Sequence, residues 1–251
     1  MDAKLAPFPS ITRTWHNTTY SSISPTRPEL SAEGKSIFIT GGGTGIGAAV
    51  VYSFAQAGAR HFALAGRTQA TLSSTAARIQ TDFPDAKVLT LITDVCKQED
   101  VNAAVEKTIQ EFGKIDICVS NAGLSPSPSP ITGMDEADWI KAFDINVNGS
   151  FYLIKAFLKH AQEGAYLINT SSGIGHMPII PNISSYIASK AAGIRIFQIV
   201  AAENPGINVF NVQPGVVVTT ASKMGNGGTA LDVDDGECPK LNVASEQKNS
   251  N

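Results

Sequence analysis

From Lys35 onward, short apolar runs alternate with longer amphipathic stretches, and this alternation limits the possible folds more than any other feature of the chain. A short apolar run is typical of a strand buried on both faces, whereas apolar residues three or four places apart predict a helix packed on a sheet. Repetition of the pair predicts βαβ units, and therefore an α/β fold with a doubly wound parallel sheet. We expect six strands, at SIFIT, HFALA, KVLTLIT, IDICVS, AYLINTS and INVFNVQ.

The stretches between these runs predict five helices, over residues 45–58, 69–83, 98–113, 135–161 and 185–203. On either side of the alternating region the pattern fades. Residues 1–34 are rich in Pro, Ser and Thr and predict an extended arm, which Trp15 and Tyr20 would attach to the body. Residues 221–251 are polar and contain several glycines, so they predict a short flexible tail. The folded domain is therefore expected to span residues 35–220.

Charge and composition narrow the class of function. The chain has 251 residues, with 19 basic and 22 acidic side chains and a net charge of −3, which disfavours a nucleic-acid partner and a polybasic membrane patch. It has no long apolar run that could cross a membrane, and its first residues do not resemble a signal peptide, so we expect a cytoplasmic protein. The three cysteines lack metal-ligand spacing, so no metal site is expected.

A glycine-rich turn, TGGGTGIG, follows the first predicted strand, and its Gly41, Gly45 and Gly47 open the first predicted helix. A turn without side chains lets the backbone approach a pyrophosphate, and the N–H groups of the helix N-terminus attract its charge. The spacing is G-x-x-x-G-x-G, which by itself also fits a simple flexible turn. The strand-turn-helix setting favours binding of a dinucleotide.

Tyr186 and Lys190 lie four places apart in a predicted helix, so both side chains project from one face. A lysine ammonium beside a phenol lowers the pKa of the phenol, which makes the pair a candidate acid/base device. Such a pair also occurs on ordinary amphipathic helices, with the lysine simply solvated. The two residues alone leave both readings open.

Six signals occur in one order: TGGGTGIG, NAG at 121–123, Asn146, SS at 171–172, YIASK at 186–190 and PGVVVT at 214–219. In this order they resemble the short-chain dehydrogenases/reductases, over roughly residues 35–220. The resemblance implies a Rossmann-type sheet, a nicotinamide cofactor, and hydride transfer to or from the carbonyl or alcohol carbon of a small organic substrate. Residues 35–220 would then form the dinucleotide-binding and catalytic domain.

The resemblance also implies a role for each candidate catalytic residue. Tyr186 would be the general acid/base, and Lys190 would lower its pKa and bind the nicotinamide ribose. Ser172 would polarise the substrate oxygen, with Ser171 as its rival because the spacing to the tyrosine is one residue longer than usual. Asn146 would hold a water that links Lys190 to solvent.

The choice of cofactor depends on the end of the second predicted strand, where an NAD-selective protein would offer an acidic side chain to the ribose. This chain has Gly66 followed by Arg67, which leaves room for a 2′-phosphate and supplies a planar cation. NADP(H) is therefore favoured over NAD(H), although Arg67 could also be a solvated residue at a helix start. The residues expected to bind the cofactor are Gly41, Gly43, Thr44, Gly45, Ile46, Gly47, Gly66, Arg67, Asp94, Val95, Asn121, Ala122, Gly123, Tyr186, Lys190, Pro214, Gly215, Val217 and Thr219.

Beyond residue 220 the sequence departs from the family pattern, because the seventh strand usual in the family has no counterpart. This leaves alternatives to an active reductase: a cofactor-binding but catalytically weak or truncated protein, or the same fold used for non-redox chemistry. The family pairs its subunits through the helices that correspond to residues 135–163 and 186–203, so a homodimer is expected.

Overall fold

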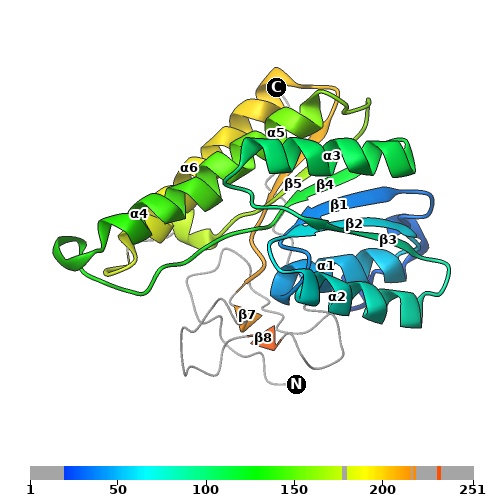
Figure 1. Cartoon of the computed structure of the whole chain (residues 1–251), viewed down its shortest axis with the longest axis horizontal. Coiled ribbons are helices and arrows are strands. Elements are labelled where there is room, and N and C mark those ends of the chain that lie inside the picture. Colours follow the sequence, from blue (N-terminus) through cyan, green and yellow to red (C-terminus); the bar gives the residue numbers. More distant parts are fainter. Residues whose placement is uncertain (1–19, 177–179, 216, 219–230, 233–251) are drawn as a thin grey trace.

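The computed structural model describes residues 20–176, 180–215, 217–218 and 231–232. Its main sheet has six strands, all parallel, in the order β3-β2-β1-β4-β5-β6 (Figure 1). The strands are β1 Ser36–Thr40, β2 His61–Gly66, β3 Lys87–Ile92, β4 Ile117–Ser120, β5 Tyr166–Thr170 and β6 Asn208–Val212. Every strand expected from the sequence is present. The predicted doubly wound, Rossmann-type sheet is confirmed, and strand order reverses between β1 and β4.

Helices cover both faces of the sheet. Helices α1 (Gly45–Gln56) and α2 (Gln69–Asp82) lie on one face, and α3 (Gln98–Phe112), α5 (Gly149–Leu158) and α6 (Ser184–Glu203) lie on the other (Figure 1). Each face has its own core: Ile39 and Leu72 belong to the first, and Phe38 and Phe197 to the second. Because neighbouring residues of β1 point to opposite faces and both faces are covered, the whole strand is buried, which is why it reads as a continuous apolar run.

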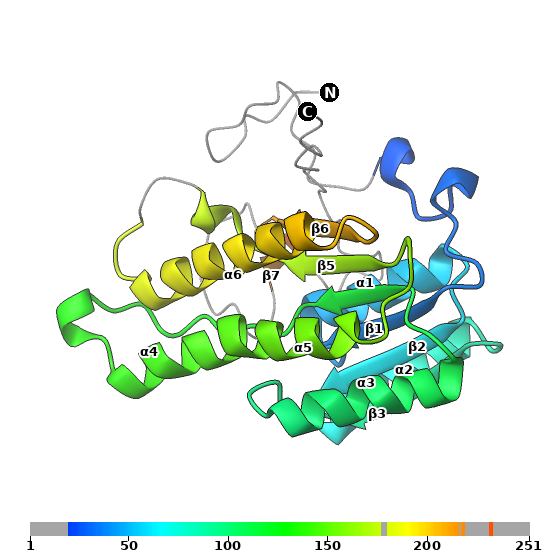
Figure 2. The same ribbon diagram turned by 90° about the horizontal axis from the view of Figure 1, so that it is seen from above.

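The stretch predicted as one helix over residues 135–161 has a change of helix type in its middle. Helix α4 (Glu136–Phe143) passes into a π-helical segment, η4 (Asp144–Asn148), which continues as α5 (Figure 2). Asp135 caps α4 by accepting a hydrogen bond from the Asp138 N–H at 3.0 Å. Single π-helical turns inside α-helices are frequent at functional sites, and this one contains Asn146.

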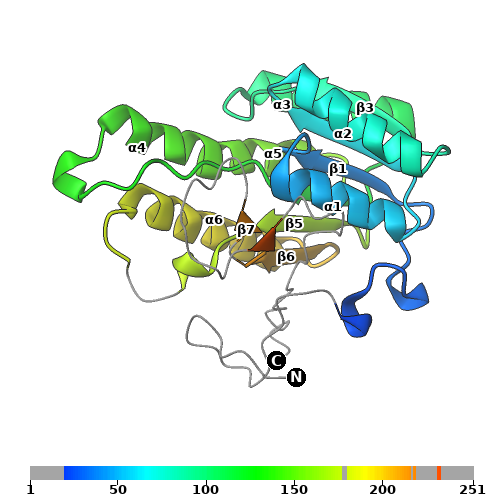
Figure 3. The same cartoon turned by 90° about the horizontal axis from the view of Figure 1, so that it is seen from below.

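The described parts of the two ends add little to the sheet. Residues 20–34 of the predicted arm contain two single-turn 3₁₀ helices, η1 (Ser21–Ile23) and η2 (Pro28–Leu30), before Ala32 packs into the core. After β6, the two-residue strand β7 (Val217–Val218) pairs in parallel with β8 (Leu231–Asp232), apart from the main sheet (Figure 3). The sequence predicted no strand in residues 221–251, so β8 is a short exception. The rest of that tail, and residues 1–19 with Trp15, lie outside the described residues.

No helix in the described ranges has the combination of length and apolarity needed to cross a membrane.

Candidate active site

The candidate site lies where the carboxyl ends of β1, β4 and β5 meet. Each of these strands ends in a residue of interest: Thr40 before the glycine turn, Ser120 before Asn121, and Thr170 before the two serines. In an open α/β sheet, ligands bind in the crevice beyond the carboxyl ends of the strands, at the point where strand order reverses. Parallel pairing therefore brings together signals that lie far apart in the sequence.

The glycine turn is folded tightly against the start of α1. Gly41 has a φ of 68°, in the left-handed region that favours glycine, and its N–H donates to the Ala65 carbonyl at 2.8 Å. A Cβ on Gly47 would collide with the Gly41 carbonyl oxygen and would lie 2.7 Å from the Asn121 amide nitrogen. Thr44 does not cap α1 through its side chain. The first N–H groups of α1 thus face a turn without obstructing side chains, an arrangement that fits a pyrophosphate.

The outer part of the same turn is held by α2. The Thr75 hydroxyl donates to the Gly43 carbonyl at 3.0 Å, and a Cβ on Gly43 would lie 2.7 Å from the Thr71 hydroxyl oxygen. The turn therefore has bonded neighbours on both sides, and α2, which begins at Gln69 soon after Arg67, is fixed to it.

Gly66 and Arg67 lie at the end of β2, beside the end of β3, where Gly66 pairs with Ile92. Arg67 is exposed. Burial raises the pKa of the Cys96 thiol to about 11, and the charge and hydrogen bond of Asp94 add to this rise. The positive charge of Arg67 acts in the opposite direction and lowers that pKa. The charges of Arg67 and Asp94 thus act on Cys96 in opposite directions. Asp94 also accepts from the Cys96 N–H at 3.1 Å.

Val95 is placed differently from Asp94. Its side chain is buried in the core, and a Cβ on Gly149 at the start of α5 would lie 3.0 Å from its Cβ. Any contact of Val95 with an adenine would have to come from its backbone.

Asn121 connects three strand ends through its side chain. Its amide nitrogen donates to the Thr40 carbonyl at 3.0 Å and to the Gly41 carbonyl at 3.4 Å, and its amide oxygen accepts from the Thr170 hydroxyl at 3.2 Å. The Thr40 hydroxyl oxygen in turn accepts from the N–H groups of Asn121 and Ala122. These bonds use both ends of the Asn121 amide. The sequence predicted that NAG lines the groove, and the side chain of its asparagine braces the strand ends there.

Asn146 is buried in the π-helical segment, and its amide bonds to two other elements. Its Oδ1 accepts from the Leu124 N–H, and its Nδ2 donates to the Leu124 carbonyl, both at 2.8 Å; Nδ2 also donates to the Ser189 hydroxyl at 2.9 Å. Ser189 is fully buried and donates to the Tyr186 carbonyl at 3.1 Å. Asn146 thereby fixes the chain after NAG and the turn of α6 that carries Tyr186. A Cβ on Gly123 would lie 3.3 Å from Asn146 Oδ1 and 3.4 Å from Lys190 Nζ, so Gly123 brings the Asn146 amide and the Lys190 ammonium to one place.

The two candidate serines differ in their surroundings. Ser171 is buried, and its N–H donates to the Val212 carbonyl of β6 at 2.8 Å. Ser172 begins the 3₁₀ turn η5 (Gly173–Gly175) and accepts from the Ile174 N–H at 3.4 Å. Its side chain lies close enough to Tyr186 to lower the pKa of the phenol. The contact with the tyrosine favours Ser172 over its rival.

Tyr186 and Lys190 project from the first two turns of α6 toward the crevice. Lys190 Nζ donates to the Thr170 carbonyl at 2.9 Å and lies 5.9 Å from the centroid of the Tyr186 ring. Burial lowers the pKa of Lys190 to about 8. Burial also raises the pKa of Tyr186, and the hydrogen bond to Ser172 opposes that rise. The sequence led us to expect a lowered tyrosine pKa, but burial is the largest influence on the phenol and raises its pKa.

The remaining predicted residues lie at the end of β6. Gly215 has a φ of 83°, and Pro214 and Val217 are buried. Thr219 lies outside the described residues. Sequence reasoning missed four residues that position the site: Thr40, Leu124, Thr170 and Ser189. Thr40 and Thr170 are the last residues of their strands, and that position is the signal which could have revealed them.

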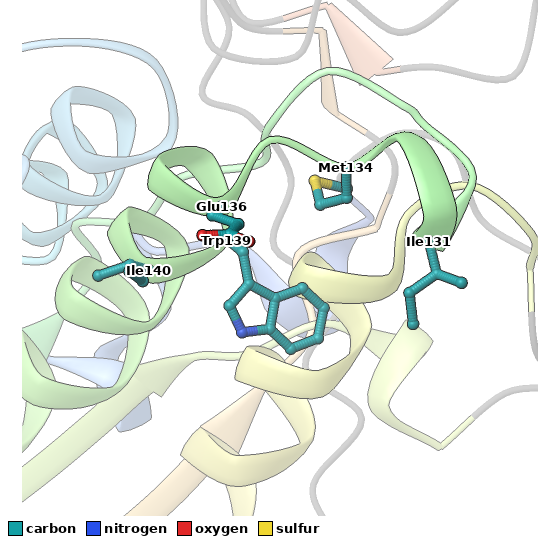
Figure 4. Close-up of a pocket in the computed structure, with 5 residues that line it drawn as sticks. All are labelled: Ile131, Met134, Glu136, Trp139 and Ile140. Atoms are coloured by element: carbon teal, nitrogen blue, oxygen red, sulfur yellow. The ribbon is translucent and has the colours of Figure 1, made fainter.

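A shallow apolar pocket of about 370 Å³ lies next to the start of α6. Ile131, Met134, Glu136, Trp139 and Ile140 line it, from η3 (Ile131–Gly133) and α4, with the Trp139 indole extending toward α6 (Figure 4). The side chains of Asn146 and Ser189 are hydrogen-bonded, so these two residues lie at the same height along their helices. The helices α4 and α5 run in the same direction as α6 (Figure 2). Trp139 comes seven residues before Asn146 and Tyr186 comes three before Ser189, so Trp139 lies about one helical turn further toward the N-terminal end than Tyr186.

Comparison with known proteins agrees with this geometry. The family model described as short chain dehydrogenase matches residues 35–227. The short chain dehydrogenase pigC of Monascus ruber is 35% identical over 214 residues, which cover 82% of this chain and 69% of that protein. A short chain dehydrogenase of Burkholderia cenocepacia, solved in complex with NADP, has a TM-score of 0.71 at 27% identity, covering 76% of this chain and 79% of that one.

A second solved structure carries the other cofactor. The 3-ketoacyl-(acyl-carrier-protein) reductase of Brucella melitensis, complexed with NADH, has a TM-score of 0.69 at 29% identity, and the match covers 76% of this chain and 79% of that one. The fold, the ordered site residues and a family match over most of the sequence agree. The chain belongs to the short-chain dehydrogenase family.

Proposed function

We propose that this oxidoreductase transfers a hydride between NADP(H) and the carbonyl or secondary alcohol carbon of a small organic substrate. The observation that carries the proposal is the grouping of Ser172, Tyr186 and Lys190 around one crevice, next to a glycine turn that fits a pyrophosphate. When bound there, a nicotinamide cofactor supplies or accepts the hydride.

The protein's own groups would manage the proton and the charge. In the reducing direction, the Tyr186 hydroxyl gives its proton to the substrate oxygen as negative charge develops on it. The Ser172 hydroxyl, which lies beside Tyr186, stabilises the same oxygen. The raised pKa keeps the phenol protonated, as a proton donor requires. Lys190, held by the Thr170 carbonyl, lies 5.9 Å from the ring and favours the phenolate once the proton has left.

The choice of NADP(H) rests on Gly66 and Arg67. Gly66 adds no side chain at the end of β2, and the exposed Arg67 that follows it offers a guanidinium. A guanidinium binds a phosphate through paired charge-assisted hydrogen bonds. The relatives do not decide the matter, since one solved structure holds NADP and the other NADH.

Replacement of Arg67 tests the cofactor. Arg67→Ala should weaken NADPH binding about tenfold to a hundredfold, because hydrogen bonds to charged groups contribute about 1.5–3 kcal/mol, and should leave NADH binding within about twofold. Isothermal titration of both cofactors measures this, with Arg60→Ala as a control, since Arg60 pairs with Asp85 instead. Equal losses for the two cofactors would contradict the assignment.

The reaction itself is tested by following NADPH absorbance while ketones and quinones are offered to the purified protein. Oxidation of NADPH that depends on one of these carbonyl compounds is the expected result. A protein that binds NADPH but oxidises it with no member of the panel would instead be the catalytically weak cofactor binder that the sequence left open. The cytoplasmic location expected from the sequence stays a prediction.

We also propose that the protein is a homodimer, paired through α4, α5 and α6. Each of these helices exposes a large apolar side chain: Ile140 on α4, Phe151 on α5 and Ile199 on α6, with exposed fractions of 57%, 46% and 55%. A dimer contact through these helices would cover all three side chains, which a subunit by itself leaves in water.

A further inference from the structure

Lys190 depends on Thr170 for its position. Its ammonium donates to the Thr170 carbonyl oxygen at 2.9 Å, across the space between α6 and the end of β5. A buried ammonium needs acceptors, because it carries three N–H groups and loses water on burial. The place of this carbonyl therefore decides where the ammonium rests.

The side chain of Thr170 ties the same residue to the cofactor side of the crevice. Its hydroxyl donates to the Asn121 amide oxygen at 3.2 Å, and the Asn121 amide nitrogen donates to the Thr40 and Gly41 carbonyls. One continuous chain of hydrogen bonds thus runs from the glycine turn through Asn121 and Thr170 to Lys190. Close packing of Gly47 on Gly41 and Asn121 leaves the first part of this chain little freedom.

We propose that Thr170 is a positioning residue: its hydroxyl, bonded to Asn121, holds its carbonyl at the point where the Lys190 ammonium is bound. The inference rests on the proposed role of Lys190. It adds to that role a link between the glycine turn and the lysine, so that the cofactor groove and the acid/base pair keep one relative geometry.

The electrostatics of Lys190 provide a direct measure of this role. Burial accounts for the lowered pKa of Lys190, and Tyr186 is the titratable side chain that the described residues place beside it. An acceptor bonded to the charged form raises a lysine pKa. A Thr170 carbonyl that is less firmly held would therefore let the pKa of Lys190 fall below about 8.

The experiment compares Thr170→Val, which removes the hydroxyl and keeps the shape, with Thr170→Ser, which keeps the hydroxyl. Lysines labelled with ¹³C at Cε are titrated by NMR, and the Lys190 signal is identified by its loss in Lys190→Arg. The midpoint should fall by about 0.5 unit or more in Thr170→Val and change by less than about 0.2 unit in Thr170→Ser. Thr170→Ala is measured alongside, and its Lys190 midpoint should fall as in Thr170→Val. A packing defect caused by the valine side chain alone therefore cannot decide the result.

Turnover gives a second readout. With the best ketone or quinone of the panel, kcat should fall about threefold to tenfold in Thr170→Val, with KM nearly unchanged and with recovery in Thr170→Ser. The same Lys190 midpoint in all variants would overturn the proposal, as would a serine variant as impaired as valine. If no carbonyl compound is reduced, the proposed function fails, and the titration still tests the position of Lys190.

Discussion

The two halves of the sheet build their parts of the site in opposite ways. Around β1, β2 and α1 the site is made of backbone and of missing side chains, since Gly41, Gly43 and Gly47 leave no space for a Cβ beside their neighbours. Around β5 and α6 it is made of side chains joined by hydrogen bonds, among them Asn146, Ser189 and Lys190. Added atoms should therefore do harm in the first half, and removed atoms in the second.

The outer surfaces of the halves differ as well. Among the described residues, α1, α2 and α3 expose no large apolar side chain, whereas α4, α5 and α6 each expose one. The helices of the first half cover the sheet with one face and meet solvent with the other. Those of the second half carry apolar groups on both faces, which is the reason to expect a partner subunit there.

The largest effect should follow from removing a single oxygen atom in the half built around β5 and α6. Tyr186→Phe deletes the proton donor while its ring stays in place, so kcat should fall about a hundredfold to ten-thousandfold with little change in NADPH affinity. Steady-state kinetics and calorimetry measure the two quantities. Tyr166→Phe is the matched control, because Tyr166 is exposed and stacks on Phe210 through a ring that phenylalanine keeps. Near-normal turnover in Tyr186→Phe would remove the basis of the mechanism.

A smaller effect should follow from adding one methyl group in the half built around β1, β2 and α1. Gly47→Ala would drive a Cβ into the Gly41 carbonyl, so unfolding free energy should fall by about 1–3 kcal/mol, with weaker NADPH binding. Gly193→Ala in α6 makes the same change where a Cβ would lie 3.7 Å from the Asn146 carbonyl oxygen, an ordinary contact. This control should be neutral or slightly stabilising, because alanine favours helix. Urea denaturation of both variants checks the contrast, and equal stabilities would refute it.

The smallest effect on the isolated chain is expected at the outer surface. Ile199→Glu places a charge at the proposed contact and should weaken the dimer while leaving the unfolding free energy of the subunit almost unchanged. The same charge at exposed Gln110 of α3, in Gln110→Glu, should leave assembly intact. Analytical ultracentrifugation over a range of concentrations compares them. A wild-type protein that stays monomeric at high concentration would argue against the whole contact surface.

Much of this architecture could be read from local patterns. All six strands of the main sheet and the glycine turn were predicted, because a strand buried on both faces leaves an apolar run and a tight turn leaves glycines. The change to a π-helical turn at Asp144–Asn148 was not predicted, since the amphipathic pattern continues through it. Ser172 could not be separated from Ser171 by spacing alone. Their burial and partners separate them.

The sequence by itself determined the order of strands along the chain, the family, and the residue types available to a hydride-transfer site. Only the tertiary structure decided which of those residues meet, because Thr40, Asn121 and Thr170 come from three strands and are joined only when the strands pair in parallel. The tertiary structure also decided that the pKa of Tyr186 is raised and not lowered. The sequence shows that a cation lies four places away, but the opposing cost of burial depends on everything packed around the phenol, and that is a property of the folded molecule.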